Sequence, residues 1–143
     1  MIRYASIIAF FMTAPVLAAK DIKATDAYVP LSPPGSMAQA AYMQLENTTD
    51  KVRSVIGVEA SGYGMAHLHS SGTKDGVATM TMLHQLDIAP GQSVSLEPGS
   101  FHIMLMRPAA MAQVGDTVDL TLLFADGDTL AVAAEVKSRA GGS

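Results

Sequence analysis

The chain has 143 residues, of which nine are Lys or Arg and 13 are Asp or Glu, giving a formal net charge of −4, and it contains no cysteine. This length suits a single domain, and the mild acidity argues against nucleic acid as a partner, because phosphate binding calls for a basic patch. The lack of cysteine excludes disulfide bonds, thiolate metal sites and the blue-copper centres of electron carriers, which need a cysteine ligand.

The first 19 residues have the composition of a secretory signal peptide. Arg3 precedes a short apolar run, and Ala18 and Ala19 supply small residues for cleavage after either of them. The apolar run is shorter than the roughly 18 residues that a membrane-spanning helix needs. We therefore expect an exported protein with no membrane span once the signal is removed. The mature domain is expected at residues 20–137, with a frayed tail at residues 138–143.

Short strands separated by turns are predicted along the mature chain. Residues 38–45 have some helix propensity, but Tyr42 and the bounding turn residues favour a strand. Alternating apolar residues predict two further strands at residues 118–124 and 130–136, joined by a hairpin at Asp126-Gly127-Asp128. Many short strands with Gly and Pro turns are typical of an all-β sandwich or barrel.

Histidine and methionine concentrate in the middle of the chain, where all four histidines and five of the ten methionines lie. They occupy alternate positions in three segments: Met65, His67 and His69; Met80, Met82 and His84; His102, Met104 and Met106. The residues between them include Leu68, Leu83, Ile103 and Leu105. Because residues two apart in a strand share a face, each segment is expected to present one thioether and imidazole face and one aliphatic face. Asp75-Gly76 predicts a hairpin between the first two segments.

Each of these side chains alone has a simpler interpretation, since methionine commonly fills cores and a lone histidine is more often a hydrogen-bonded polar residue. The joint pattern favours a metal site, because thioether and imidazole suit Cu(I) better than zinc, magnesium or calcium. The alternative is a secreted interaction or adhesion module whose Met-rich surface contacts a partner. The sequence contains neither a G-x-S-x-G elbow nor an HExxH helix, so we expect a protein that is not an enzyme.

The spacing of four of these residues resembles the signature of the PCuAC family of periplasmic copper chaperones. Ten residues separate His69 from Met80, 21 separate Met80 from His102, and one separates His102 from Met104. The similarity extends along the mature chain, at Ala40-Ala41-Tyr42-Met43 followed by Asn47, and at Asp75-Gly76-Val77, Pro90-Gly91, Pro98-Gly99 and Gly115-Asp116.

This resemblance implies a cupredoxin-like Greek-key β-sandwich that binds one Cu(I) through four ligands: His69, Met80, His102 and Met104. It implies a periplasmic, monomeric carrier that transfers copper to a partner, either the cytochrome c oxidase subunit with the dinuclear copper centre or a Sco-type protein. Residues 138–143 contain neither His nor Met, unlike family members with a copper-binding C-terminal extension. Met82 and His84 are expected to pack or to lie at the surface. For Met65, His67 and Met106, a second metal ion, assistance in transfer and simple packing stay open.

Histidine ligation predicts a pH dependence, because an imidazole must be neutral to bind a metal ion. Since free histidine titrates near about 6.5, protons are expected to compete with Cu(I) for His69 and His102 below roughly pH 6.

Overall fold

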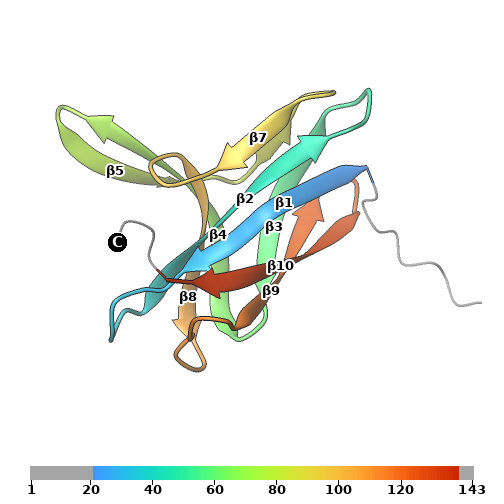
Figure 1. The fold of residues 1–143 in the computed structure, drawn as a ribbon. Helices are drawn as coiled ribbons and strands as arrows, with labels where there is room; N and C mark the ends of the chain where they lie inside the picture. Colours follow the sequence, from blue (N-terminus) through green and yellow to red (C-terminus); the bar gives the residue numbers. More distant parts are fainter. Residues whose placement is uncertain (1–20, 139–143) are drawn as a thin grey trace, which may run out of the picture.

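Ten β-strands make up the computed structural model of the protein, which describes residues 21–138 (Figure 1). They are β1 (Ile22–Pro30), β2 (Ala38–Asn47), β3 (Arg53–Ala60), β4 (Tyr63–Lys74), β5 (Val77–Met82), β6 (Leu86–Ile88), β7 (Ser93–Leu96), β8 (Phe101–Pro108), β9 (Thr117–Phe124) and β10 (Thr129–Lys137). Within the described range there is no helix long and apolar enough to cross a membrane. The predicted signal peptide and nearly all of the predicted tail lie outside the described residues.

The strands predicted from alternation are confirmed. Residues 38–45 form part of β2 and are not helical. β9 and β10 are antiparallel, with Thr129 opposite Leu123 across the predicted Asp126-Gly127-Asp128 turn. β4 and β5 pair antiparallel around Asp75-Gly76, where both residues have positive φ, as a type I′ hairpin turn requires.

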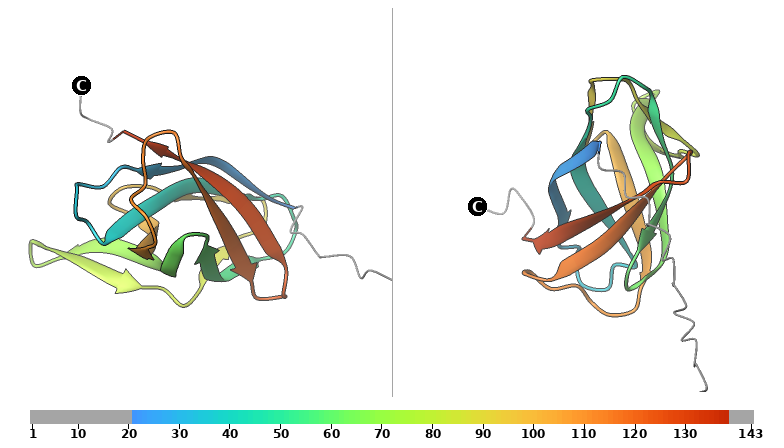
Figure 2. Two further views of the ribbon diagram at one scale, coloured as in Figure 1. Left: turned by 90° about the horizontal axis from the view of Figure 1, so that it is seen from below. Right: turned by 90° about the vertical axis from the view of Figure 1, so that its right-hand side faces the viewer.

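All ten strands belong to one hydrogen-bonded sheet, in the order β5-β4-β8-β7-β2-β1-β10-β9-β3-β6, with β8 also paired to β2. The sheet bends over so that its strands form two layers (Figure 2). β1 connects the layers, because it pairs antiparallel with β2 and parallel with β10. The predicted all-β sandwich is therefore confirmed, and its layers are two parts of a single sheet.

Alternating apolar side chains fill the space between the layers. Those of β9 and β10 are the ones that the alternation predicted: Val118, Leu120, Leu122, Phe124, Val132, Ala134 and Val136. The other layer contributes Leu68 from β4 and Ile103 and Leu105 from β8 to the same hydrophobic cluster. Because these three residues point into the core, their sequence neighbours point to the opposite face of β4 and β8.

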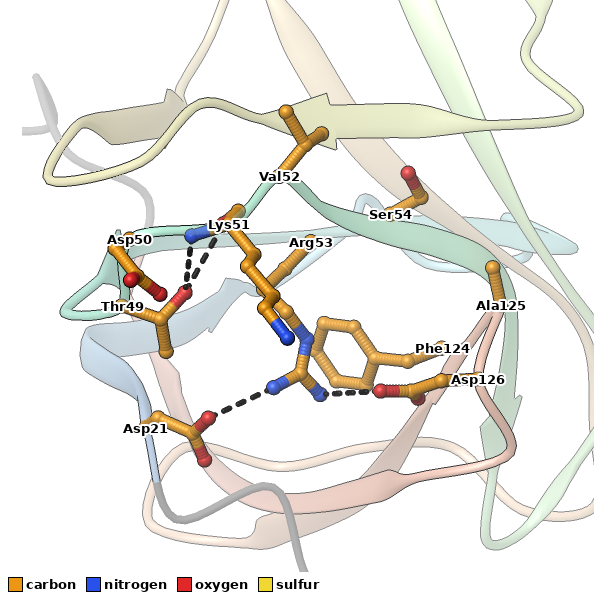
Figure 3. A pocket seen from close by; sticks show the side chains of 10 residues that line it. All are labelled: Asp21, Thr49, Asp50, Lys51, Val52, Arg53, Ser54, Phe124, Ala125 and Asp126. Atoms are coloured by element: carbon orange, nitrogen blue, oxygen red, sulfur yellow. Dashed lines mark hydrogen bonds and ion pairs between the residues drawn. The ribbon is translucent and has the colours of Figure 1, made fainter.

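A buried cation joins three segments near one end of the core. Arg53 of β3 donates hydrogen bonds to Asp21 at 2.9 Å and to Asp128 at 2.8 Å, and its guanidinium lies 3.3 Å from Asp126. The guanidinium also lies 5.1 Å from the ring centre of Phe124. Figure 3 shows Arg53 between Asp21 and Asp126, at the wall of a pocket. These contacts connect the start of β1 and the β9–β10 turn to β3.

The β4–β5 hairpin extends away from the rest of the sheet (Figure 1). Every residue of β5 is exposed, including Met80 and Met82. The expectation that this segment buries an aliphatic face holds only at Leu83, which follows the strand; within β5, Thr79 and Thr81 alternate with the two methionines and are exposed. Leu83 itself packs against the core, where its backbone N–H donates to the carbonyl of Leu68.

Candidate metal centre

The register between β4 and β8 brings the two central histidines together. His69 lies directly opposite His102, and their ring centres are 5.6 Å apart. Leu68 and Ile103 fix this arrangement, because their burial in the core turns the neighbouring imidazoles to the other face of both strands. His102 is only 4% exposed. The sequence pattern thus yields a pair of facing imidazoles, of which His102 is buried and His69 is half-buried.

The same register arranges the other thioether and imidazole groups in rows on this face. Across β4 and β8, His67 lies opposite Met104, and Met65 lies opposite Met106. Across β4 and β5, Met82 lies opposite His69, and Met80 lies opposite Ser71. Directly opposite residues in antiparallel strands share a face. We call this surface the Met–His face; its residues are Met65, His67, His69, Met80, Met82, His102, Met104 and Met106.

The methionines of the Met–His face are not core residues. Met43 of β2 is the fully buried methionine of the hydrophobic cluster. Met65, Met104 and Met106 are half-buried but do not belong to that cluster or to the apolar residues packed against it. The interpretation of these methionines as core filler is therefore wrong, and their thioethers gather on the side of the sheet that faces away from the core.

Two ring nitrogens of the histidine pair are buried without a partner. Nδ1 of His69 and Nε2 of His102 have no hydrogen-bond partner among the described residues. Nδ1 of His102 lies 3.4 Å from the carbonyl oxygen of Ser100, to which it can donate. That tautomer leaves the lone pair of Nε2 free, an arrangement typical of histidines that ligate metals and donate their other N–H to a carbonyl. Buried polar atoms of this kind are rare in folded proteins, and a metal ion would satisfy both.

The electrostatic surroundings keep His69 neutral. Burial lowers the pKa of His69 below its ordinary value of 6.5, and the neighbouring imidazoles of His102 and His67 lower it further. His69 is therefore neutral at neutral pH, so its lone pair is available to a cation without loss of a proton.

The remaining two predicted ligands differ in how close they lie to the histidine pair. Met104 is two residues from His102 on β8 and one row from His69. Met80 is one row away on the other side, at the exposed hairpin, and is itself 59% exposed. The predicted ligands thus share one face, with three of them on two adjacent strands and Met80 at its outer edge.

Met82, which was expected to pack or to lie at the surface, lies directly opposite His69 in the β4–β5 register. Counting back from the two-residue turn at Asp75-Gly76 would have placed Met82 opposite His69, because Lys74 must then face Val77. Met82 is exposed, as expected. His84 is exposed beyond the end of β5 and lies outside these rows.

The chemistry of the Met–His face suits a soft cation. Within residues 21–138, no three His, Cys, Asp or Glu side chains are grouped so that they could hold a metal ion. An ion bound by His69 and His102 would therefore need thioethers to complete its ligands. Neutral imidazole and thioether together favour Cu(I) over harder divalent cations.

The family described as "Putative lipoprotein LpqE-like" matches the chain over residues 22–136. Among curated proteins, "Putative lipoprotein Lxx21020" of Leifsonia xyli subsp. xyli is 36% identical over 108 residues, which cover 75% of this chain and 65% of that protein. "Uncharacterized protein RP573" of Rickettsia prowazekii is 30% identical over 88 residues, covering 61% of this chain and 49% of that protein. The chain thus spans less than two thirds of the length of these relatives.

Solved structures share the fold. Apo-DR1885 from Deinococcus radiodurans has a TM-score of 0.66 at 30% identity, over 100% of this chain and 97% of that chain. The solution structure of CuI-DR1885 has a TM-score of 0.65 at 31% identity, over 92% and 85% of the two chains. A copper-bound PCuAC domain from PmoF2 has a TM-score of 0.70 at 20% identity, over 89% and 99%. These matches confirm the predicted cupredoxin-like fold class.

Proposed function

The chain belongs to the LpqE-like family and has the PCuAC fold that its sequence resembles, and on this basis we propose that it is an exported Cu(I) carrier. It holds one Cu(I) through His69, Met80, His102 and Met104. The identity of 31% to CuI-DR1885 supports copper as the cargo. The family description as lipoproteins, and the same description of the relative from Leifsonia xyli, support export.

The observation that carries this proposal is the pair of buried ring nitrogens, on His69 and His102, that have no hydrogen-bond partner within residues 21–138. Leaving a buried polar atom unpaired costs about 1–3 kcal/mol, so the fold retains this pair at the expense of stability. Binding of a soft cation by the two neutral imidazoles would offset this loss of stability. A sheet face that served only as an adhesive surface would not need two facing imidazoles behind its methionines.

The exposure of the ligands suits transfer of copper more than permanent storage. His102 is buried, whereas Met80 is largely exposed on a projecting hairpin. A partner's ligands can therefore replace Met80 first, while the histidines still hold the ion. Delivery toward the dinuclear copper centre of cytochrome c oxidase, directly or through a Sco-type protein in the periplasm, is the proposed destination. The protein acts in this scheme as a monomeric carrier that performs no catalysis.

Titration of the mature protein with Cu(I) against a chromogenic chelator tests the proposal. The variants His69→Ala and Met104→Ala should each weaken the tightest equivalent, His69→Ala by at least about 100-fold, because loss of a ligand exceeds the 10–100-fold cost of losing an outer-shell partner. The control His84→Ala, an exposed histidine outside the rows, should bind as the unmodified protein does. Folded protein without submicromolar Cu(I) binding would instead support the Met-rich interaction module.

A further inference from the structure

We infer that the Met–His face holds a second, weaker Cu(I) site, formed by Met65, His67 and Met106. The inference rests on the proposed function, since it assigns these residues to the same cargo. They are the half-buried members of the face that the first four-ligand set leaves unused. Their donors, two thioethers and one imidazole, are of the same types as those of the first site.

The register brings these three donors together. Met65 and Met106 lie directly opposite each other on β4 and β8, a position in which Cβ atoms are about 4.5–5.5 Å apart. His67 is in the next row, two residues from Met65 on the same strand and therefore on the same face. Two thioethers from adjacent strands and one imidazole beside them can therefore converge on one ion.

The β2 residues beside this part of the face are small. On β2, the residues opposite Met106 and Met104 are Ala38 and Ala40, whose methyl groups do not extend over the thioethers. Ala38, Ala40 and Met104 are among the residues that line one pocket. Neither Met65 nor Met106 packs with the hydrophobic core, so core packing does not explain why half-buried thioethers occupy both positions.

The row of ligands ends at Met65 and Met106 for a structural reason. Arg107 has a positive φ of 56°, which interrupts the alternation of β8. On the facing strand, Tyr63 packs against the core and donates a hydrogen bond to Gln39. The Met–His face therefore has a defined inner end, and the second site lies between that end and the first site.

The second site is continuous with the first. The ring centre of His67 lies 6.4 Å from that of His69, and His67 lies opposite Met104, a ligand of the first site. An ion can thus pass between the sites while remaining in contact with the face. Because two monovalent ions on one face repel each other, the second ion is expected to bind roughly tenfold more weakly or worse.

Anaerobic Cu(I) titration with chelators of graded affinity tests this inference. The unmodified protein should bind two equivalents, and Met65→Leu combined with Met106→Leu should bind only the tighter one, with unchanged affinity. Leucine keeps the volume and the apolar character of methionine, so a packing or docking role would survive this change. A matched control is Met37→Leu combined with Met111→Leu, two exposed methionines outside the face, which should retain both equivalents.

The outcomes separate this inference from the proposed function. A single equivalent in the unmodified protein, or a second equivalent that persists in Met65→Leu/Met106→Leu, overturns the second site and leaves the carrier function intact. Failure of the first equivalent overturns the carrier function. Selective changes in the methyl resonances of Met65 and Met106 during addition of the second equivalent are the expected spectroscopic result, and changes confined to Met80 and Met104 would contradict it.

Discussion

Arg53 and the His69–His102 pair both place polar nitrogen atoms out of reach of solvent, but the fold surrounds them differently. Arg53 is surrounded by three carboxylates and an aromatic ring, so its charge is compensated. The histidine pair keeps one buried nitrogen on each ring without a partner among the described residues. The two groups therefore differ in whether the described part of the protein supplies partners for their nitrogen atoms.

This difference separates a structural polar group from a functional one. Asn47 resembles Arg53, because its buried amide donates to the carbonyls of Lys51 and Ile88 and accepts from the backbone N–H and the hydroxyl of Thr49. A protein gains stability from buried polar groups only when their partners are present. The nitrogens of the His69–His102 pair are therefore best explained by a ligand from outside the chain. We expect that substitutions at Arg53 and at the histidine pair change stability and copper binding independently.

The largest expected effect is on copper binding in His102→Leu. Loss of this imidazole should weaken Cu(I) binding by at least about 100-fold, beyond the cost of losing an outer-shell partner. The copper-free protein should keep its stability or gain up to about 1 kcal/mol, because leucine removes a buried atom that lacks a partner. Chelator competition and chemical denaturation measure the two effects. A marked loss of stability in copper-free His102→Leu would show that the imidazole is a structural group, like Arg53.

The converse variant, Arg53→Met, should lower stability and leave copper binding unchanged. The ion pairs with Asp21 and Asp126 are partly exposed, so screening reduces their value, and we expect a loss of about 2 kcal/mol. Methionine retains the apolar contact with Phe124. Denaturation with and without Cu(I) is the measurement, and a parallel fall in Cu(I) affinity would mean that the two regions are coupled through the sheet.

Much of the fold could be predicted because its signals are local. Alternation identified the buried residues of β9 and β10, and the turn residues at Asp75-Gly76 and Asp126-Gly127-Asp128 identified both hairpins. The single bent sheet could not be predicted, because it depends on the parallel pairing of β1 with β10. These strands lie at opposite ends of the described chain, and their pairing leaves no periodic signal in either one.

The sequence predicted that the candidate ligands share one face of the strands, but not how exposed each ligand is. Alternation around Leu68 and Ile103 was enough to place the imidazoles and thioethers on one face. It could not reveal that His102 is buried while Met80 is exposed, because exposure depends on which strands lie alongside. β4 and β8 are flanked by neighbours, whereas β5 is an edge strand on a projecting hairpin.

The pH dependence of Cu(I) binding tests whether the His69–His102 pair, in contrast to Arg53, is a metal-binding group. Because the pKa of His69 lies below 6.5 in the folded protein, proton competition should begin at a lower pH than for a free histidine. Affinity should stay nearly constant from pH 8 to about 6 and then fall, by up to about tenfold for each pH unit and each proton displaced. Affinity that is independent of pH down to about 5 would argue against ligation by His69.

The same shift affects the copper-free protein. A histidine whose pKa is lowered by folding binds fewer protons in the folded state than in the unfolded state. Stability is therefore full above the ordinary value of 6.5 and declines as the pH falls through the window below it. Denaturation of the copper-free protein across this range should show the decline, and His69→Leu should reduce it, whereas Arg53→Met should leave it in place.

The smallest expected effect concerns the exposed edge of the face, where Met80→Leu and Met82→Leu form a matched pair. Met82 lies directly opposite His69, and Met80 lies one row away, yet the four-ligand spacing selects Met80. Both side chains are exposed on a hairpin that lacks core packing, so neither variant should alter stability by more than about 0.5 kcal/mol. Loss of one exposed thioether should weaken Cu(I) about tenfold in Met80→Leu and leave Met82→Leu nearly unchanged. A larger loss of affinity in Met82→Leu than in Met80→Leu would instead make Met82 the fourth ligand. Strand register would then be a better guide to this site than the spacing of residues in the sequence.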